Sequence, residues 1–122
     1  MVDILGSVLQ FQNLKNEQNG ETIVSAYMIF DVRRGDDRDA MKPYGEKVMS
    51  TLEPYGGKII AASDDVVVRE GDWDFDRILI VEFPSMEAAQ AWYDSPEYQE
   101  ILPIRLKANS DQMVIVDGLS AD

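Results

Sequence analysis

The sequence FPSMEAAQAWYDSPEYQEILPIR, at residues 83–105, decides the fold of this chain. It begins as the end of a strand, and Ser85 follows as the N-cap of a helix. Ser95 and Pro96 then start a second helix, because serine caps helices and proline is favoured at the first helical position. Pro103 predicts a break or a kink in this second helix. The stretch therefore predicts a strand end followed by two capped helices.

Strands are predicted on both sides of this stretch. Alternating apolar residues predict strands at residues 23–33 and 77–83, and a last strand is expected at residues 112–117. Two further extended segments, residues 58–62 and 66–70, flank a polar turn. They are either one long strand with a bulge or a tight hairpin.

A helix is predicted between the first two strands. Its apolar residues recur at spacings of three and four from Met41 to Tyr55, and Gly56 supplies the C-terminal stop. The order of elements is then β-α-β-β-α-β. Because strand–helix–strand crossovers are right-handed, this order predicts an α+β fold of the ferredoxin-like βαββαβ type, with one antiparallel sheet and the helices on one face.

The sheet face opposite the helices is predicted to be apolar and uncovered. An apolar face of that size argues for a partner, and the simplest partner is a second copy in a two-fold homodimer, sheet facing sheet. The residues expected on this face are Tyr27, Ile29, Ile78, Ile80, Met113 and Ile115.

Size and composition indicate a single globular domain. The chain has 122 residues, of which 45% are hydrophobic and 9% aromatic, which is enough to bury a core. We expect residues 1–22 to be an N-terminal extension and residues 23–122 to form the ferredoxin-like domain.

The chain contains no cysteine and no histidine. It therefore offers no thiolate nucleophile, no imidazole base near neutral pH and no histidine-ligated haem. The acidic residues at 36–37 and 72–74 are interpreted as turns, so neither a metal site nor a cofactor is predicted.

The formal net charge of −12 argues against two classes of partner. Such a field repels phosphate backbones and anionic lipid surfaces, so we expect no nucleic acid and no membrane as a partner. Neither a targeting segment nor an apolar stretch of about 20 residues is evident in the sequence, and we expect an acidic cytoplasmic protein.

Several short motifs together resemble a known family. They are Ala26-Tyr27, Tyr55-Gly56-Gly57, Glu70-Gly71-Asp72-Trp73, Glu82-Phe83-Pro84-Ser85, Trp92-Tyr93-Asp94-Ser95-Pro96-Glu97-Tyr98-Gln99, Arg105 and Val116-Asp117-Gly118. With these motifs, residues 25–119 resemble domain-of-unknown-function family 1330, in the dimeric α+β barrel superfamily. Residues 1–22 depart from the family pattern.

The resemblance implies a homodimer of ferredoxin-like subunits and implies no reaction. The superfamily includes haem-degrading monooxygenases, cofactor-free monooxygenases, lactone isomerases and dehalogenase-like enzymes, which are analogies of fold alone. Several of these enzymes depend on a histidine, which this chain lacks.

Asp31 and Glu82 are the candidate catalytic residues. We take the first and third strands to be parallel neighbours, so that both carboxylates lie at one end of the uncovered face. Two carboxylates close together would raise the pKa of one of them and supply an acid or a base. The alternative is that each pairs with an arginine or meets water at the sheet edge.

The candidate ligand-binding residues are Arg105, Tyr27, Trp73 and Tyr98. Arg105 could hold a carboxylate, or it could form a structural salt bridge to Asp94, Glu97 or a sheet-end acid. We expect Arg105 and Tyr27 to share one cavity, in which Tyr27 either contacts a ligand or packs at the subunit interface. The aromatic residues would line a pocket for a small organic acid or an aromatic ligand.

Two functions follow from these residues. The first is a homodimeric domain that binds a small molecule in a cavity between its sheet and the partner subunit. The alternative is a histidine-free, cofactor-independent enzyme, of the isomerase or monooxygenase type, that uses a carboxylate in that cavity. A purely structural or interaction role is a third possibility.

Overall fold

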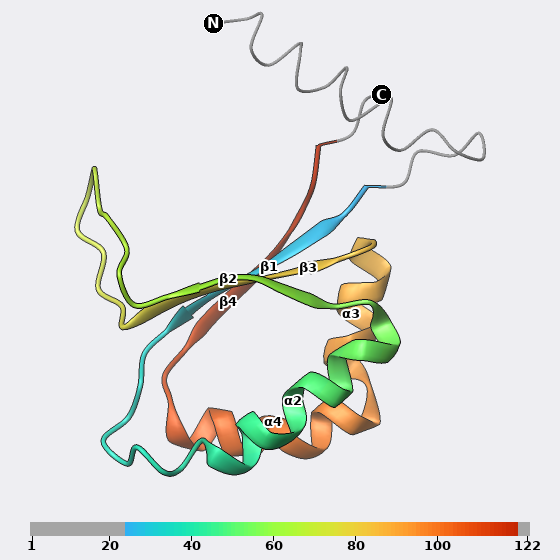
Figure 1. Ribbon diagram of the computed structural model, residues 1–122, viewed down its shortest axis with the longest axis horizontal. Helices are drawn as coiled ribbons and strands as arrows, with labels where there is room; N and C mark the ends of the chain where they lie inside the picture. The colour runs from blue at the N-terminus through green and yellow to red at the C-terminus, as the bar shows by residue number, and fades with distance from the viewer. Residues whose placement is uncertain (1–23, 120–122) are drawn as a thin grey trace, which may run out of the picture.

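The computed structural model describes residues 24–119, which form one four-stranded sheet with all their helices on the same side (Figure 1). All neighbouring strands are antiparallel, and their spatial order is β2-β3-β1-β4. The predicted ferredoxin-like α+β fold is confirmed. In chain order the elements are β1 (Ala26–Val32), α2 (Lys42–Leu52), the 3-10 turn η1 (Glu53–Tyr55), β2 (Lys58–Ser63), β3 (Arg77–Phe83), α3 (Met86–Asp94), α4 (Pro96–Ala108) and β4 (Gln112–Asp117).

The expected N-terminal extension, residues 1–22, lies outside the described residues. None of the helices between residues 24 and 119 is long and apolar enough to cross a membrane.

The direction of β3 differs from the prediction. β1 and β3 are neighbours, but they run antiparallel, with Tyr27 opposite Glu82 and Asp31 opposite Ile78. The reason is topological. The crossover through α2 makes β2 parallel to β1, and the connection after β2 then reverses the chain, so β3 runs antiparallel to both. The C-terminal ends of the neighbouring strands β1 and β3 therefore lie at opposite ends of the sheet, measured along the strands.

The two serine caps form as predicted. Ser85 accepts a hydrogen bond from the Ala88 backbone N–H at 3.0 Å, and Ser95 accepts one from the Tyr98 N–H at 3.2 Å. Each bond satisfies one of the backbone donors that a helix start leaves unpaired.

The predicted break at Pro103 is wrong, because α4 continues through it to Ala108. Pro103 faces solvent. The backbone carbonyl one turn earlier, which receives no hydrogen bond from proline, is therefore able to bind water. The buried Ile101 and Leu102 hold this part of the helix against the core.

The core lies between the helices and the helix face of the sheet. Trp92 stacks on Tyr98, with ring centroids 3.9 Å apart, and packs against Phe83 at 5.7 Å. The Trp92 indole N–H donates a hydrogen bond of 2.9 Å to Thr51 on α2. One buried side chain of α3 thus joins both other helices and the sheet. The apolar residues buried with it include Ala26, Met28, Phe30, Leu52, Val81, Ala89, Ile101 and Leu102.

The opposite side of the sheet, which we call the outer face, is apolar as expected but differs in two residues. Phe30 pairs with Met113 and Met28 pairs with Ile115, so this part of β4 faces the helices. The positions between them face outward, and Val114 has 60% of its surface exposed. The large apolar residues on the outer face are Tyr27, Ile29, Ile78, Ile80, Val114 and Val116.

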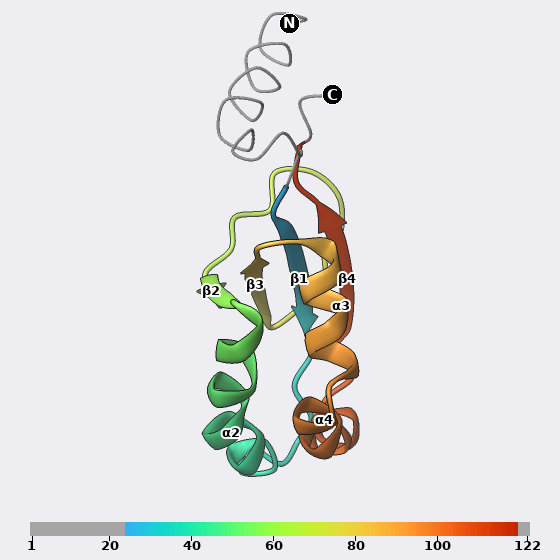
Figure 2. The same ribbon diagram turned by 90° about the vertical axis from the view of Figure 1, so that its right-hand side faces the viewer.

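Residues 64–76, which we call the arm, connect β2 to β3. The arm extends from the sheet on the side away from the helices (Figures 1 and 2). Neither alternative for residues 66–70 is correct, because they form no strand, and the irregular register lies earlier, between Ile59 and Ala61. Gly71 in the arm has φ of +86°, a conformation that favours glycine.

We expect the substitution Gly35→Ala to destabilise the fold. A Cβ atom at Gly35 would overlap the backbone oxygen of Ala108, where the chain leaving β1 crosses the end of α4. Overpacking against backbone typically costs about 1–3 kcal/mol, and urea denaturation measures it. Gly45→Ala is the matched control: its Cβ meets nothing within 4 Å, and replacing a mid-helix glycine should stabilise the fold by about 0.5–1 kcal/mol. Equal effects of the two substitutions would contradict the close approach at Gly35.

Candidate functional site

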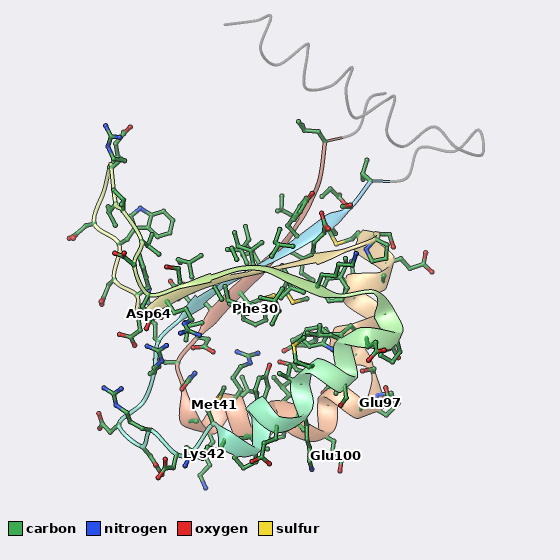
Figure 3. The ribbon with its side chains drawn as sticks, viewed as in Figure 1. Phe30, Met41, Lys42, Asp64, Glu97 and Glu100 are labelled. Atoms are coloured by element: carbon green, nitrogen blue, oxygen red, sulfur yellow. The ribbon has the colours of Figure 1, made fainter. Side chains whose placement is uncertain are left out.

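A cavity of about 490 Å³ lies between the helix face of the sheet and helices α2 and α4. Figure 3 shows Phe30 extending from the sheet toward these helices, with Met41 at the start of α2 and Asp64 at the sheet edge. Much of the lining is apolar, including Phe30, Val32, Met41, Tyr44, Val48, Leu52, Ile59, Leu79, Val81 and Trp92. The charged lining residues are Arg34, Arg38, Arg77, Arg105, Asp37, Asp64 and Asp111.

Arg105 lies at the inner end of this cavity and is almost fully buried. Its Nε donates a hydrogen bond of 3.2 Å to the Tyr98 hydroxyl, and its Nη1 lies 3.4 Å from Asp111 Oδ2. The guanidinium carbon lies 5.3 Å from the centroid of the Phe30 ring, within the range of a cation–π interaction. These contacts hold the guanidinium in one position against the cavity wall.

Asp111 is the counter-ion of Arg105, and only 2% of its side chain is exposed. Its Oδ1 also accepts a hydrogen bond of 2.8 Å from the Arg33 backbone N–H, and Asn109 Nδ2 lies 3.4 Å from its Oδ2. A buried carboxylate needs such donors, because an unpaired one is costly. The pair therefore fixes α4 to the start of β4 and to the chain after β1.

Two buried tyrosines lie beside Arg105, of which Tyr44 lines the cavity and Tyr98 lies in the core behind it. The hydroxyls of Tyr44 and Tyr98 lie 2.8 Å apart and share a hydrogen bond, and the rings meet edge to face. Burial is the largest cause that raises the pKa of the Tyr44 phenol well above its ordinary value, and the neighbouring Tyr98 raises it further. Tyr44 is therefore a neutral hydrogen-bonding group at neutral pH.

Asp64, Arg34 and Arg77 form a second charged group at the sheet edge, which we call the edge cluster. Asp64 Oδ1 accepts hydrogen bonds from Arg77 Nε at 2.6 Å and from Arg34 Nη2 at 3.2 Å. The hydrogen bonds from Arg77 and then Arg34 lower the pKa of the Asp64 carboxyl below its ordinary value. Asp64 is therefore ionised at neutral pH.

The structure separates the two predicted catalytic carboxylates. Glu82 lies opposite Tyr27 at one end of β1, whereas Asp31 lies at the other end. Asp31 accepts two hydrogen bonds from the Arg33 guanidinium, at 3.1 and 3.0 Å, which is the arginine pairing considered as the alternative. The expected pair at one end of the sheet is therefore wrong, because it rested on parallel strands.

The expected cavity shared by Arg105 and Tyr27 is also wrong. Arg105 faces the cavity on the helix face, and Tyr27 lies on the outer face, because it alternates with the buried Ala26 and Met28. Tyr98 contacts Arg105 from within the core. These three residues therefore do not share one binding surface.

Trp73 lies on the arm and does not line the cavity, and 62% of its surface is exposed. With Phe75 it packs edge to face, and both line a smaller apolar hollow of about 280 Å³ between the arm and the outer face. Ile29 and Ile78 of the sheet line the same hollow.

Sequence reasoning missed most of the charged residues of the cavity. Asp64 was read as part of a turn, and Arg34 directly follows a strand, where charged residues are common. Asp111 gave a usable signal, because it stands just before β4, and a salt bridge to a sheet-end acid was one of the alternatives for Arg105.

Comparison with known proteins gives a family and a fold. Residues 25–119 match the family described as Domain of unknown function (DUF1330). No curated protein matches the chain. The structure is similar to that of RPA0582, a protein of unknown function from Rhodopseudomonas palustris, at 22% identity and a TM-score of 0.63 over 92% of each chain.

Two further solved structures share the fold at lower identity. A conserved protein of unknown function from Bacteroides thetaiotaomicron, described as a possible oxidoreductase, has 16% identity and a TM-score of 0.53 over 80% of this chain and 100% of its own. SnoaB from Streptomyces nogalater, a cofactor-independent oxygenase, has 11% identity and a TM-score of 0.50 over 79% of this chain and 92% of its own. At these identities the likeness shows the fold alone.

We expect Arg105→Met to lower the free energy of unfolding by about 3–5 kcal/mol, because it leaves the Asp111 carboxylate buried without its counter-ion. The double variant Arg105→Met/Asp111→Asn should recover part of this loss, since no buried charge then remains. Urea denaturation of the four proteins in the cycle measures the coupling. Arg38→Met is the control, since Arg38 also lines the cavity but is exposed and forms no ion pair within residues 24–119. A double variant no more stable than Arg105→Met would contradict the pairing.

Proposed function

Because this chain belongs to the DUF1330 family, whose description assigns no function, we propose its function from the cavity: it binds a small organic acid between its sheet and its helices. The observation that carries this proposal is the charge of the lining. Four of the six arginines in the chain line the cavity, against three aspartates, so the lining has a net charge of +1 in a chain of net charge −12.

The volume and the lining support a small organic ligand. About 490 Å³ lies within the range of 300–1,000 Å³ that is usual for small-molecule sites. Phe30, Val48 and Leu79 present apolar surface to this space, which suits a hydrocarbon or aromatic body. The arginines suit an acidic group, since a guanidinium binds a carboxylate through two parallel hydrogen bonds.

The fixed position of Arg105 supports recognition without rearrangement. Tyr98, Asp111 and Phe30 hold its guanidinium in place, so a ligand would not bear the entropy of ordering a long side chain. The Tyr44 hydroxyl beside it adds a neutral hydrogen-bonding group. This inner end favours a ligand with a polar substituent as well as an acid.

The outer face supports a homodimer as the functional unit. Its six large apolar residues form a continuous surface across β3, β1 and β4, and the arm extends it. A second copy, sheet facing sheet, would remove this surface from water. The ligand cavity lies on the other side of the sheet, so each subunit would carry its own site.

The enzymatic alternative loses its original support. It drew its acid or base from one of two carboxylates expected to lie close together, and Asp31 and Glu82 lie at opposite ends of β1. SnoaB, which shares the fold, is described as a cofactor-independent oxygenase, but at 11% identity this description does not carry over to this chain. The binding function is therefore preferred.

We expect benzoate, but not the uncharged benzamide, to raise the melting temperature in a concentration-dependent way. A ligand that binds only the folded state stabilises it by about 2.7 kcal/mol at one hundred times its dissociation constant. Gly45→Leu should abolish the shift while the protein stays folded, because the new side chain enters open space at the cavity wall. If neither benzoate nor a panel of other aromatic and aliphatic carboxylates shifts the melting temperature, the proposed function is wrong.

We expect light scattering after size exclusion to find a dimer, and Val114→Glu to yield a monomer at micromolar concentration. A charge on the outer face opposes burial of that face, and Val114 is exposed enough in the single chain to tolerate it. Leu106→Glu is the matched control, because Leu106 is equally exposed, at 60%, but lies on α4 away from the sheet. A monomeric wild-type protein would refute the dimer.

A further inference from the structure

The edge cluster brings together three separate parts of the chain at the cavity. Arg34 lies beyond the end of β1, Asp64 is the first residue of the arm after β2, and Arg77 begins β3. All three line the cavity, and the Asp64 carboxylate lies between the two guanidinium groups. No other residue in the described part of the chain forms an ion pair with either arginine.

One carboxylate does not satisfy two arginines. Asp64 engages Nη2 of Arg34 and Nε of Arg77. Within residues 24–119, Nε and Nη1 of Arg34 and both Nη atoms of Arg77 donate no hydrogen bond to protein. Among the cavity-lining residues, the edge cluster therefore has a surplus of one positive charge and a set of donors, since in this part of the chain the Asp76 carboxylate binds only the Arg34 backbone N–H, at 2.7 Å, and does not line the cavity, whereas Arg105 is already neutralised by Asp111.

The Asp64 carboxylate is able to leave its position at little cost. Its side chain is 53% exposed, and those of Arg34 and Arg77 are 38% and 40% exposed. Ion pairs at such exposed positions contribute little net stability, because water and salt compete for both partners. Asp64 also stands at the root of the arm rather than inside a strand, so its backbone is not held by a strand partner.

We propose that the edge cluster is the subsite for the acidic group of the ligand and that Asp64 occupies it as an internal competitor. An incoming carboxylate takes the place of the Asp64 carboxylate between Arg34 and Arg77, while the ligand body extends into the apolar cavity. Asp64 thereby sets the affinity threshold and rejects ligands whose anionic group binds the two arginines less well than its own carboxylate. This inference rests on the proposed function and assigns its acid-binding residues.

The test is a titration of wild-type protein and of Asp64→Asn with sulfate, in which NMR signals of the backbone amides report binding. The ionic strength is kept constant, with chloride as the balancing ion. Removing the competitor should strengthen sulfate binding by about three- to tenfold, since a weak exposed contact no longer holds the site. The amide signals that shift should include those of Arg34, Gly35 and Arg77. Adding Arg77→Gln to the Asp64→Asn variant should reverse the gain.

Asp37→Asn is the matched control. It removes the same charge from the cavity lining, but the Asp37 carboxylate accepts a hydrogen bond from the Asp39 backbone and contacts neither arginine of the edge cluster. Its sulfate affinity should change by less than about twofold. Equal gains for Asp37→Asn and Asp64→Asn, or weaker binding by Asp64→Asn, would overturn the proposal, because charge alone or loss of a positioning contact would then explain the result.

A benzoate titration of the same variants separates this inference from the proposed function. Benzoate binding to wild-type protein with no gain for Asp64→Asn retains the cavity function and rejects the competitor role. A sulfate gain at Arg34 and Arg77, with neither benzoate nor any acid of the carboxylate panel binding to either protein, retains the anion subsite and rejects the organic-acid function.

Discussion

The buried ion pair between Arg105 and Asp111 is the interaction on which the rest of this structure depends. It is the one ion pair within residues 24–119 whose two side chains are both buried, and it joins α4, the start of β4 and the chain that leaves β1. The same guanidinium contacts Tyr98 in the core and Phe30 on the sheet. Because a charge cannot be left alone in this position, the pair fixes where α4 ends relative to the sheet and so positions one wall of the cavity.

The sheet divides the surface of the domain into two parts with different chemistry. The helix face carries a cavity with an arginine-rich lining, and the outer face carries aliphatic side chains and Tyr27. Strand alternation produces this division, because neighbouring residues of β1 face opposite sides. The cavity proposed to bind a ligand and the face proposed to bind a second copy therefore share no residues.

The sequence predicts the elements of this fold better than their relations. Serine caps and apolar spacing are local signals, and they located α2, α3 and α4 within a few residues. The sequence does not show which side of β4 faces the helices. Its residues Met113, Val114, Ile115 and Val116 are all apolar, so either alternate set could face the core. The valine-rich part of the arm has strand-like composition but no strand partner. The site was predicted only at Arg105, since residues such as Asp64 and Arg34 meet through the topology alone.

The position of Asp64 at the root of the arm has a consequence for communication between the two faces. The arm leaves the cavity edge and reaches over the outer face, so one continuous segment has contacts in both places. A ligand that displaces Asp64 would also move the base of the arm, and a second copy that contacts the arm would also affect the position of Asp64. Thermodynamic linkage makes such an effect reciprocal: if occupancy of the cavity altered self-association, self-association would alter occupancy by the same factor. Under the two proposals, the arm would connect ligand binding to self-association without movement of the sheet itself.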